Sequence, residues 1–309
     1  MPSKLAKRVL FGSVMIVALA GLLYLDWWLE DALDLGPRGI VKRFEATGEW
    51  AAFGSPLYCL PTTAVLLAIL ITGYLEFDKL ARASGIRLLS VSGLIAVALI
   101  STSPYLHHLF PRYSGVDPSM LLIFALMGIC GEQFVRYRTR DALRQVAATV
   151  LAVVYLGVAG SFILSIRTLG VAHLVIFLAA VKFTDIGAYF TGMAVGRHKM
   201  IPWLSPGKTW EGLFGGLVAA AVVSAVLARS LGALSPEIAW RHALVFGVVM
   251  GVAGQFGDLC ESLLKRSANV KDSGAVVPEF GGVLDLIDSP LLAAPVAMLL
   301  MRTSWLWTT

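Results

Sequence analysis

Long apolar runs, separated by short polar segments, recur along the whole chain. A helix needs roughly 20 consecutive, mostly apolar residues to cross the hydrocarbon core of a bilayer. Runs of about this length lie at 9–29, 57–75, 86–103, 118–135, 146–166, 170–192, 211–231, 239–257 and 289–307. The pattern therefore predicts an all-α, polytopic integral membrane protein with about nine transmembrane helices, connected by cytoplasmic interfacial helices and loops.

The composition agrees with a membrane protein and excludes an ordinary soluble domain. Apolar residues make up 57% of the chain and charged residues 15%, and the mean hydropathy is +0.77. A soluble domain holds about 25% charged residues. Cys59, Cys130 and Cys260 are odd in number and show no CxxC spacing, which argues against a disulfide framework or a structural zinc site.

The positive charges predict how the chain is oriented in the membrane. The first run ends in Asp26-Trp27-Trp28 and not in a small-residue cleavage site, so it is interpreted as a retained span and not a signal peptide. With the N terminus in the cytoplasm, the cytoplasmic side carries twice as many Lys and Arg residues as the opposite side. We therefore expect a multi-pass protein of the inner (plasma) membrane, with its N terminus and active site cytoplasmic.

The spans divide into three consecutive parts. We expect N-terminal helices 1–3 with an interfacial segment in 1–117, middle helices 4–6 in 118–192, and catalytic helices 7–9 with a signature loop in 193–309. Two basic segments, 76–87 and 136–144, read as short interfacial helices. A plain loop on the positively charged side of the membrane explains either segment equally well.

The densest group of charges lies between Gly257 and Asp288. Six carboxylates occur there among three cations, with apolar spans on both sides. A charged group near hydrocarbon costs roughly 2.5–3.5 kcal/mol on insertion scales, so a functional site is the default interpretation. A salt-bridge network is the structural alternative.

The eighth span predicts a packed face that becomes charged at its cytoplasmic end. Positions that recur at spacings of three and four fall on one side of a helix. Here they are Gly247, Gly251, Gly254, Asp258, Glu261, Ser262 and Lys265. The glycines permit close helix contact, and the charges continue the same face. We therefore expect a column of carboxylate, hydroxyl and ammonium groups above a tight helix contact.

The sixth span carries Lys182, Asp185 and Tyr189 on one face. One interpretation is a self-neutralising Lys182–Asp185 pair that holds helices together. The other makes Asp185 part of a polar site that is approached from the cytoplasm.

The segment Ser205–Gly212, SPGKTWEG, resembles a Walker A motif only superficially. The position that would need the first glycine is Pro202, and no soluble strand precedes it. We expect Ser205 to be a helix N-cap followed by Pro206 at the first helical position. Lys208 would then lie in the first turn, available to a phosphate.

Asp285 and Asp288 are three residues apart, just before Ser289-Pro290 begins the last span. One helical turn would place both carboxylates on the same face, and Gly281 and Gly282 would let the preceding loop approach a ligand closely. Several carboxylates with interleaved cations suit Mg²⁺ that bridges phosphate oxygens.

The spacing of these residues resembles that of the phosphatidate cytidylyltransferases, also called CDP-diacylglycerol synthases. The resemblance rests on the C-terminal half: Asp185-Ile-Gly-Ala-Tyr-Phe, the Ser205–Gly212 segment, Gly257-Asp258-Leu-Cys-Glu261-Ser262, Ser262-x-x-Lys265-Arg266 with Lys271-Asp272 further on, and Gly281-Gly282 before Asp285-x-x-Asp288. The N-terminal half matches only loosely. The combination is far more specific than any single piece.

The resemblance implies transfer of CMP from CTP to phosphatidic acid, giving CDP-diacylglycerol and pyrophosphate at the bilayer, with Mg²⁺ and K⁺ as a candidate second metal. It implies a homodimer and no nucleic-acid partner. The implied metal ligands are Asp258, Glu261, Asp285 and Asp288, with a metal pair on Asp258 and Asp285. The implied catalytic residues are Lys265, Arg266, Lys271 and Asp272. The expected substrate-binding residues are Asp185, Tyr189, Ser205, Lys208, Glu211, Ser262, Gly281 and Gly282.

Three positions depart from the family pattern, of which Val277 in place of the usual Leu or Ile is a trivial change. Phe280 replaces the usual His, and Leu286 replaces the usual Arg. Four alternatives stay open: a CTP-dependent polyisoprenoid kinase, another lipid cytidylyltransferase, a membrane transporter and an inactive homologue. A kinase would release CDP, whereas a cytidylyltransferase releases pyrophosphate. The transporter alternative is based on Lys182 and Asp185, which lie within a span. The inactive-homologue alternative is based on Phe280 and Leu286.

Overall fold

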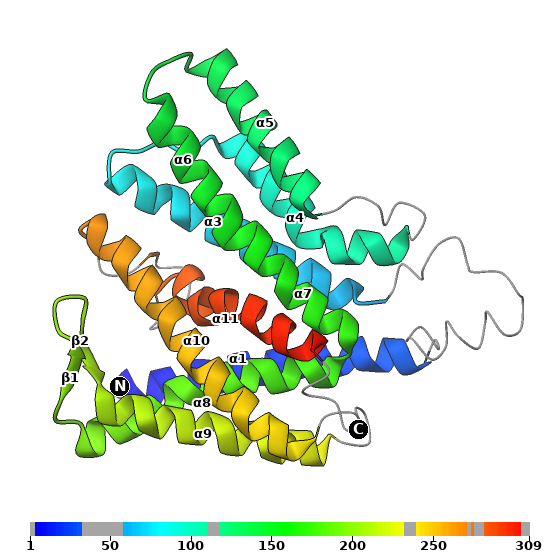
Figure 1. Cartoon of the computed structure of the whole chain (residues 1–309), viewed down its shortest axis with the longest axis vertical. Coiled ribbons are helices and arrows are strands. Elements are labelled where there is room, and N and C mark those ends of the chain that lie inside the picture. Colours follow the sequence, from blue (N-terminus) through cyan, green and yellow to red (C-terminus); the bar gives the residue numbers. More distant parts are fainter. Residues whose placement is uncertain are drawn as a thin grey trace, which may run out of the picture. The chain divides into compact units, whose positions relative to one another are not determined.

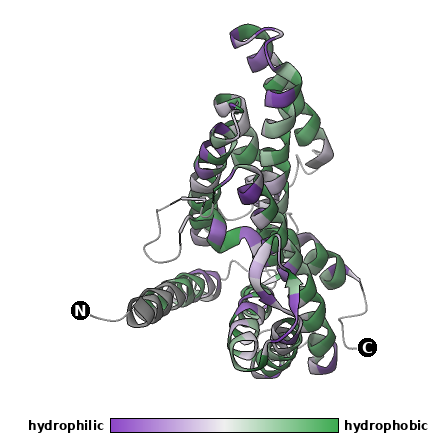
Figure 2. Ribbon diagram, turned by 90° about the vertical axis from the view of Figure 1, so that its left-hand side faces the viewer, coloured by the Kyte–Doolittle hydropathy of each residue, from purple (hydrophilic) through white to green (hydrophobic). Residues whose placement is uncertain are grey.

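The computed structural model describes residues 4–32, 58–110, 118–231, 239–270, 273–274 and 281–303. Helices dominate this part of the chain, as the apolar runs predict (Figure 1). Their residues are hydrophobic along most of each helix (Figure 2). Within the described residues, eight helical segments are long and apolar enough to cross a membrane. A further helix, α1 (Lys4–Ala32), covers the first predicted span. The protein is therefore an all-α, polytopic membrane protein.

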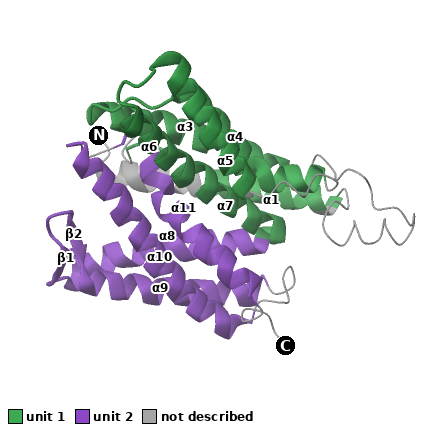
Figure 3. Cartoon of the chain, turned by 45° about the horizontal axis from the view of Figure 1, so that its top comes forward, with its two compact units in different colours: residues 1–171, 274–283 green, residues 172–273, 284–309 purple. Residues whose placement is uncertain are grey.

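The chain falls into two compact units (Figure 3). Unit 1 comprises residues 1–171 and 274–283, and unit 2 comprises residues 172–273 and 284–309. This grouping differs from the three consecutive parts expected from the sequence, which remain a prediction.

Unit 1 contains α1 and the helices of the N-terminal half. These are α3 (Leu60–Ala83), α4 (Ser90–Leu109), α5 (Pro118–Arg136) and a continuous segment made of α6 (Ala142–Ala152), the π-helical η2 (Val153–Val158) and α7 (Ala159–Leu169). The segment 274–283 also belongs here, and its Val283 amide donates to Glu76 Oε1 at 3.0 Å.

A buried charge network joins three helices of unit 1. Arg167 of α7 is fully buried and donates to Asp26 of α1 at 2.7 Å and to Glu30 of α1 at 2.9 Å. Thr62 of α3 donates to the same Asp26 oxygen at 2.5 Å. The ring of Tyr58 lies 5.5 Å from the Arg167 guanidinium carbon. These contacts fix α1 against α3 and α7.

Unit 2 contains the helices of the C-terminal half and a small hairpin. Its elements are α8 (Val171–Val195), β1 (Lys199–Ile201), β2 (Ser205–Thr209), α9 (Trp210–Ser230), α10 (Trp240–Ser267) and α11 (Leu284–Arg302). The two strands pair antiparallel, with Lys199 opposite Thr209 and Ile201 opposite Ser205. Helix α10 packs against both α9 and α11.

The glycine face predicted on the eighth span is a packing face. A Cβ at Gly247 would lie 2.4 Å from the Ala220 carbonyl oxygen of α9, and one at Gly251 would lie 2.6 Å from Leu217 of α9. A Cβ at Gly257 would lie 2.8 Å from the carbonyl oxygen of Asp288 in α11. These glycines let α10 approach α9 and α11 closely, so the charges at the end of α10 face α11.

Several local expectations prove wrong. Ser205 is not an N-cap, because Ser205–Thr209 forms the strand β2. The N-cap of α9 is Thr209, whose hydroxyl accepts from the Gly212 amide at 3.1 Å. Hairpin pairing occupies the backbone of Ser205, and helix α9 starts only after this pairing ends. The last helix starts at Leu284 and runs through Pro290, so it begins earlier than Ser289.

The two basic segments do not form helices of their own. Residues from Glu76 continue α3 to Ala83, since good helix formers fill this stretch up to Ser84-Gly85. Between α5 and α6 the chain makes a turn, in which Arg138 and Asp141 have positive φ. Gln133 of α5 donates to the carbonyl oxygens of Arg138 and Arg140 and so stabilises that turn.

Candidate functional site

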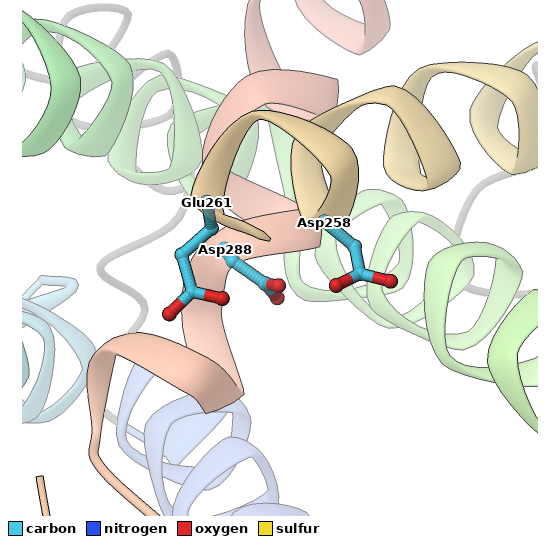
Figure 4. Close-up of side chains that lie close together, drawn as sticks. All are labelled: Asp258, Glu261 and Asp288. Atoms are coloured by element: carbon cyan, nitrogen blue, oxygen red, sulfur yellow. The ribbon is translucent and has the colours of Figure 1, made fainter. Parts of the chain in front are cut away.

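Three carboxylates of unit 2 converge where α10 meets α11. Asp258 and Glu261 lie on α10, and Asp288 lies in the first turns of α11 (Figure 4). One carboxylate oxygen from each lies within 4.8 Å of the others. Glu261 and Asp288 are buried, and Asp258 is partly exposed. Such oxygen donors are the ligands that Mg²⁺ prefers, so this group could hold a divalent cation.

Cations and hydroxyl groups surround this carboxylate group. Lys208 of β2 forms an ion pair with Asp258. Lys265, one turn beyond Glu261, forms ion pairs at 2.5 Å with both Glu261 and Asp285. The sequence-predicted column on α10 thus exists, and its last member bridges two carboxylates on different helices.

The two aspartates of α11 have different partners. Asp285 accepts from Lys265, and its second oxygen accepts from the Ser273 amide at 3.1 Å and the Ser273 hydroxyl at 2.8 Å. Asp288 accepts from the Ser289 amide at 2.5 Å. Asp285 lies outside the group of three convergent carboxylates, so its expected role as a metal ligand stays a prediction.

A cavity of about 520 Å³ opens beside the carboxylates, within unit 2. Its charged lining residues are Lys182, Asp185, Lys208, Asp258, Asp285 and Asp288. Backbone and small side chains of Gly192, Gly207, Thr209 and Gly212 form part of its wall, as does the exposed Tyr189. The cavity therefore combines opposite charges with small residues, a lining suited to a charged polar ligand.

The remaining predicted residues of unit 2 have mostly structural contacts. Arg266 donates to the Leu204 carbonyl oxygen at 3.4 Å. Glu211 accepts from the amides of Arg197 and His198 and lies 2.5 Å from His198 Nδ1. Ser262 is buried on the packed face of α10, and Ser205 lies in β2 opposite Ile201.

Other predicted residues lie elsewhere. Gly281 and Gly282 belong to the segment of unit 1, where Gly281 has φ +97°, a conformation that favours glycine. Lys271, Asp272 and the replaced position Phe280 lie outside the described residues.

Sequence reasoning missed Ser273, Ser289 and Gln255. Ser273 binds Asp285, Ser289 binds Asp288, and Gln255 lines the cavity. Their positions beside or one turn from a predicted carboxylate are the only sequence signal that marks them. The fold and the site together define a multi-pass membrane protein in which a cluster of carboxylates and the lysines paired with it lie near the helix ends.

Comparisons with known proteins narrow this class. Residues 50–304 match the model of the cytidylyltransferase family. The phosphatidate cytidylyltransferase of Bacillus subtilis (strain 168) is 32% identical over 250 residues, which cover 78% of this chain and 89% of that protein. That of Staphylococcus saprophyticus is 29% identical over 240 residues, covering 77% and 89%. The uncharacterized protein YnbB of Escherichia coli (strain K12) is 41% identical over 134 residues, covering 43% and 44%.

The chain therefore belongs to the cytidylyltransferase family. It is an enzyme of the nucleotidyltransferase class.

Proposed function

We propose that the enzyme transfers CMP from CTP to phosphatidic acid, forming CDP-diacylglycerol and pyrophosphate. The observation that carries this proposal is the convergence of Asp258, Glu261 and Asp288 beside a cavity with lysines in its lining. The names of the relatives from Bacillus and Staphylococcus support the choice of phosphatidate as acceptor.

The donor set fits a magnesium ion. All three groups offer carboxylate oxygens, and Glu261 Oε1 is buried without a hydrogen-bond partner. A buried oxygen of this kind carries a desolvation cost that a cation would offset. Asp258, Glu261 and Asp288 would hold Mg²⁺, with K⁺ as a candidate second ion. Bound there, Mg²⁺ would offset negative charge on the phosphoryl group that is transferred.

The chain's own residues bind and orient the substrates in this proposal. Lys208 faces the carboxylate group from β2 and neutralises phosphate charge. Gly207 is exposed in the cavity wall and leaves backbone accessible to the triphosphate. Lys265 fixes Glu261 and Asp285 relative to each other. Arg266, Lys271 and Asp272 are proposed as further catalytic residues from the family resemblance: Arg266 and Lys271 would bind phosphate, and Asp272 would orient these cations.

The chemistry needs positioning more than a side-chain nucleophile. A phosphate oxygen of phosphatidic acid attacks the α-phosphorus of CTP, and the bond from that phosphorus to the bridging oxygen breaks. Pyrophosphate leaves with the electron pair of the broken bond. The enzyme contributes by aligning the two phosphates and by excluding water from the cavity.

We place this reaction at the cytoplasmic face of the inner (plasma) membrane, where CTP is available. The excess of Lys and Arg on the side that carries the hairpin and the end of α10 supports this orientation. A homodimer is proposed from the family resemblance alone.

The proposal is tested with purified enzyme in phosphatidate-containing nanodiscs, Mg²⁺ and CTP labelled in its α-phosphate. We expect label in CDP-diacylglycerol, equimolar pyrophosphate, and loss of both with a chelator. Release of CDP with a phosphorylated lipid would indicate a kinase instead. No labelled lipid, under conditions in which the Bacillus subtilis relative is active, would contradict the proposal.

A further inference from the structure

Lys182 is half-buried within the apolar helix α8, and the partner of its ammonium group is a backbone carbonyl and not a carboxylate. Its Nζ donates to the backbone carbonyl oxygen of Leu286 in α11 at 2.8 Å. Among the described residues, no ion pair joins Lys182 to Asp185, one turn further along α8. The self-neutralising pair considered from the sequence is therefore not what holds this lysine.

The carbonyl that Lys182 contacts lacks its normal partner. In an α-helix the carbonyl of residue i accepts from the amide of residue i+4. Four residues after Leu286 is Pro290, which lies inside α11 and has no amide proton. A polar backbone group left unpaired away from water is destabilising. The ammonium of Lys182 supplies the donor that Pro290 cannot provide.

The Leu286 carbonyl that accepts from Lys182 lies between the two aspartates of α11. Leu286 follows Asp285 directly, and Asp288 comes two residues later, still ahead of Pro290. Lys182, Asp285 and Asp288 also line the same cavity. A free carbonyl at Leu286 would let the first turn of α11 open, and both carboxylates would shift with it.

We propose that Lys182 is a positioning residue: it replaces the missing amide donor of Pro290 and so holds the first turn of α11, with Asp285 and Asp288, in place. The activity part of its test rests on the proposed function, whereas the contact itself belongs to the fold. The competing explanation is that the charge of Lys182 acts on the cavity directly, without the carbonyl contact.

A rescue experiment separates the two explanations. Lys182→Met removes the donor, and we expect turnover to fall roughly 10- to 100-fold, the effect of misplacing catalytic groups by about 1 Å. Pro290→Ala restores an amide proton for Leu286, so Lys182→Met should cost about tenfold less in that background. Lys182→Arg, which keeps a donor, should retain most of the turnover.

Pro295 of the same helix offers the matched control. Because Pro295 has no amide proton, the carbonyl of Leu291 lacks its normal helical donor, whereas the carbonyl of Leu286 is unaffected. Pro295→Ala therefore stiffens α11 without supplying the proposed bond, and the loss caused by Lys182→Met should persist in it. Rescue by Pro295→Ala as well would overturn the proposal.

Hydrogen exchange provides a readout that does not need activity. We expect the peptide that contains Ile287, Asp288 and Ser289 to exchange faster in Lys182→Met and to regain protection with Pro290→Ala. Unchanged exchange in Lys182→Met, or no recovery of exchange and turnover with Pro290→Ala, overturns the proposal even when the wild-type enzyme makes CDP-diacylglycerol.

The proposal stays testable if Lys182→Met does not fold. Recovery of folded protein by Pro290→Ala, and not by Pro295→Ala, then supports the proposal, and failure to recover folded protein overturns it. Wild-type enzyme that forms no lipid product contradicts the proposed function alone.

Discussion

The carboxylates of the site differ in their partners, and two of them share a lysine. Lys208 pairs with Asp258, Lys265 pairs with both Glu261 and Asp285, and Ser289 binds Asp288. Because one lysine joins α10 to α11, a change at Asp285 also affects Glu261. Substitution of Asp285 and substitution of Asp288 should therefore affect the enzyme in different ways.

Asp288→Asn should impair metal binding, whereas Asp285→Asn should chiefly release Lys265. For Asp288→Asn we expect turnover to fall roughly 100-fold or more. The Mg²⁺ concentration for half-maximal activity should rise roughly 10- to 100-fold. Asp285→Asn should lower turnover with a smaller change in Mg²⁺ requirement. Magnesium titrations of initial rates measure both quantities.

Asp141→Asn is the matched control for these variants. Asp141 is exposed at the turn before α6, where Asn tolerates its positive φ of 48°. This control should leave the magnesium dependence unchanged. Equal magnesium dependence in Asp288→Asn and wild type would argue against the group of three carboxylates as the metal site.

At the scale of elements, the contact between α10 and α11 sets the spacing of the site. Gly257 precedes Asp258, and its Cα faces the backbone of Asp288 and Ser289. A side chain there would separate the two helices that carry the convergent carboxylates. Small residues at such crossings permit close approach of helix backbones in membranes.

Gly257→Ala should therefore impair catalysis without touching a charged group. The added Cβ would lie 2.8 Å from the Asp288 carbonyl oxygen, so backbone must move. We expect turnover to fall roughly 100-fold, as for other displacements of about 1 Å, together with a lower melting temperature. Steady-state kinetics and a thermal unfolding assay in detergent measure the two effects.

Gly131→Ala serves as the control, since a Cβ at this position of α5 meets nothing within 4 Å. Its melting temperature should stay the same or rise slightly, because Ala is the better helix former. If Gly257→Ala behaved like this control, close approach of α10 and α11 would not matter for the site.

At the scale of the whole molecule, unit 1 depends on a buried charge network of its own. Arg167 is fully buried and forms ion pairs with Asp26 and Glu30. Removing one partner of a buried pair leaves an uncompensated charge, which costs roughly 3–5 kcal/mol.

Arg167→Leu should thus lower the melting temperature strongly and loosen α1. Arg302→Leu, at the exposed end of α11, should change it little. Hydrogen exchange of the α1 peptide that contains Asp26 and Glu30 should be faster in Arg167→Leu than in either the wild type or Arg302→Leu. Equal stability of the two variants would show that the network does not hold α1.

The orientation of the whole chain makes a separate prediction. Lys199 of β1 and Arg241 of α10 are both exposed, at opposite ends of unit 2 spans. In a cysteine-free background, a membrane-impermeant thiol reagent added to intact cells should label Arg241→Cys and not Lys199→Cys. Inside-out vesicles should give the reverse pattern. Labelling of Lys199→Cys in intact cells would place the hairpin outside.

The sequence by itself determined the membrane class, the helical spans and the charged face of α10. These features depend on local hydrophobicity and on helical periodicity, which a single segment carries in full. The combined spacing of Lys265, Arg266, Asp285 and Asp288 also identified the family. Most helix positions followed, with ends shifted by several residues where α3 and α10 continue past their apolar runs.

Only the tertiary structure decided which charges meet. The gathering of Asp258 and Glu261 with Asp288, the bridge from Lys265 to Asp285, and the contact of Lys182 with Leu286 join segments far apart in sequence. The hairpin at Ser205–Thr209 likewise overrode a plausible N-cap, because strand pairing with β1 satisfies the same backbone groups. Such choices depend on competition between long-range partners, and no local pattern contains them.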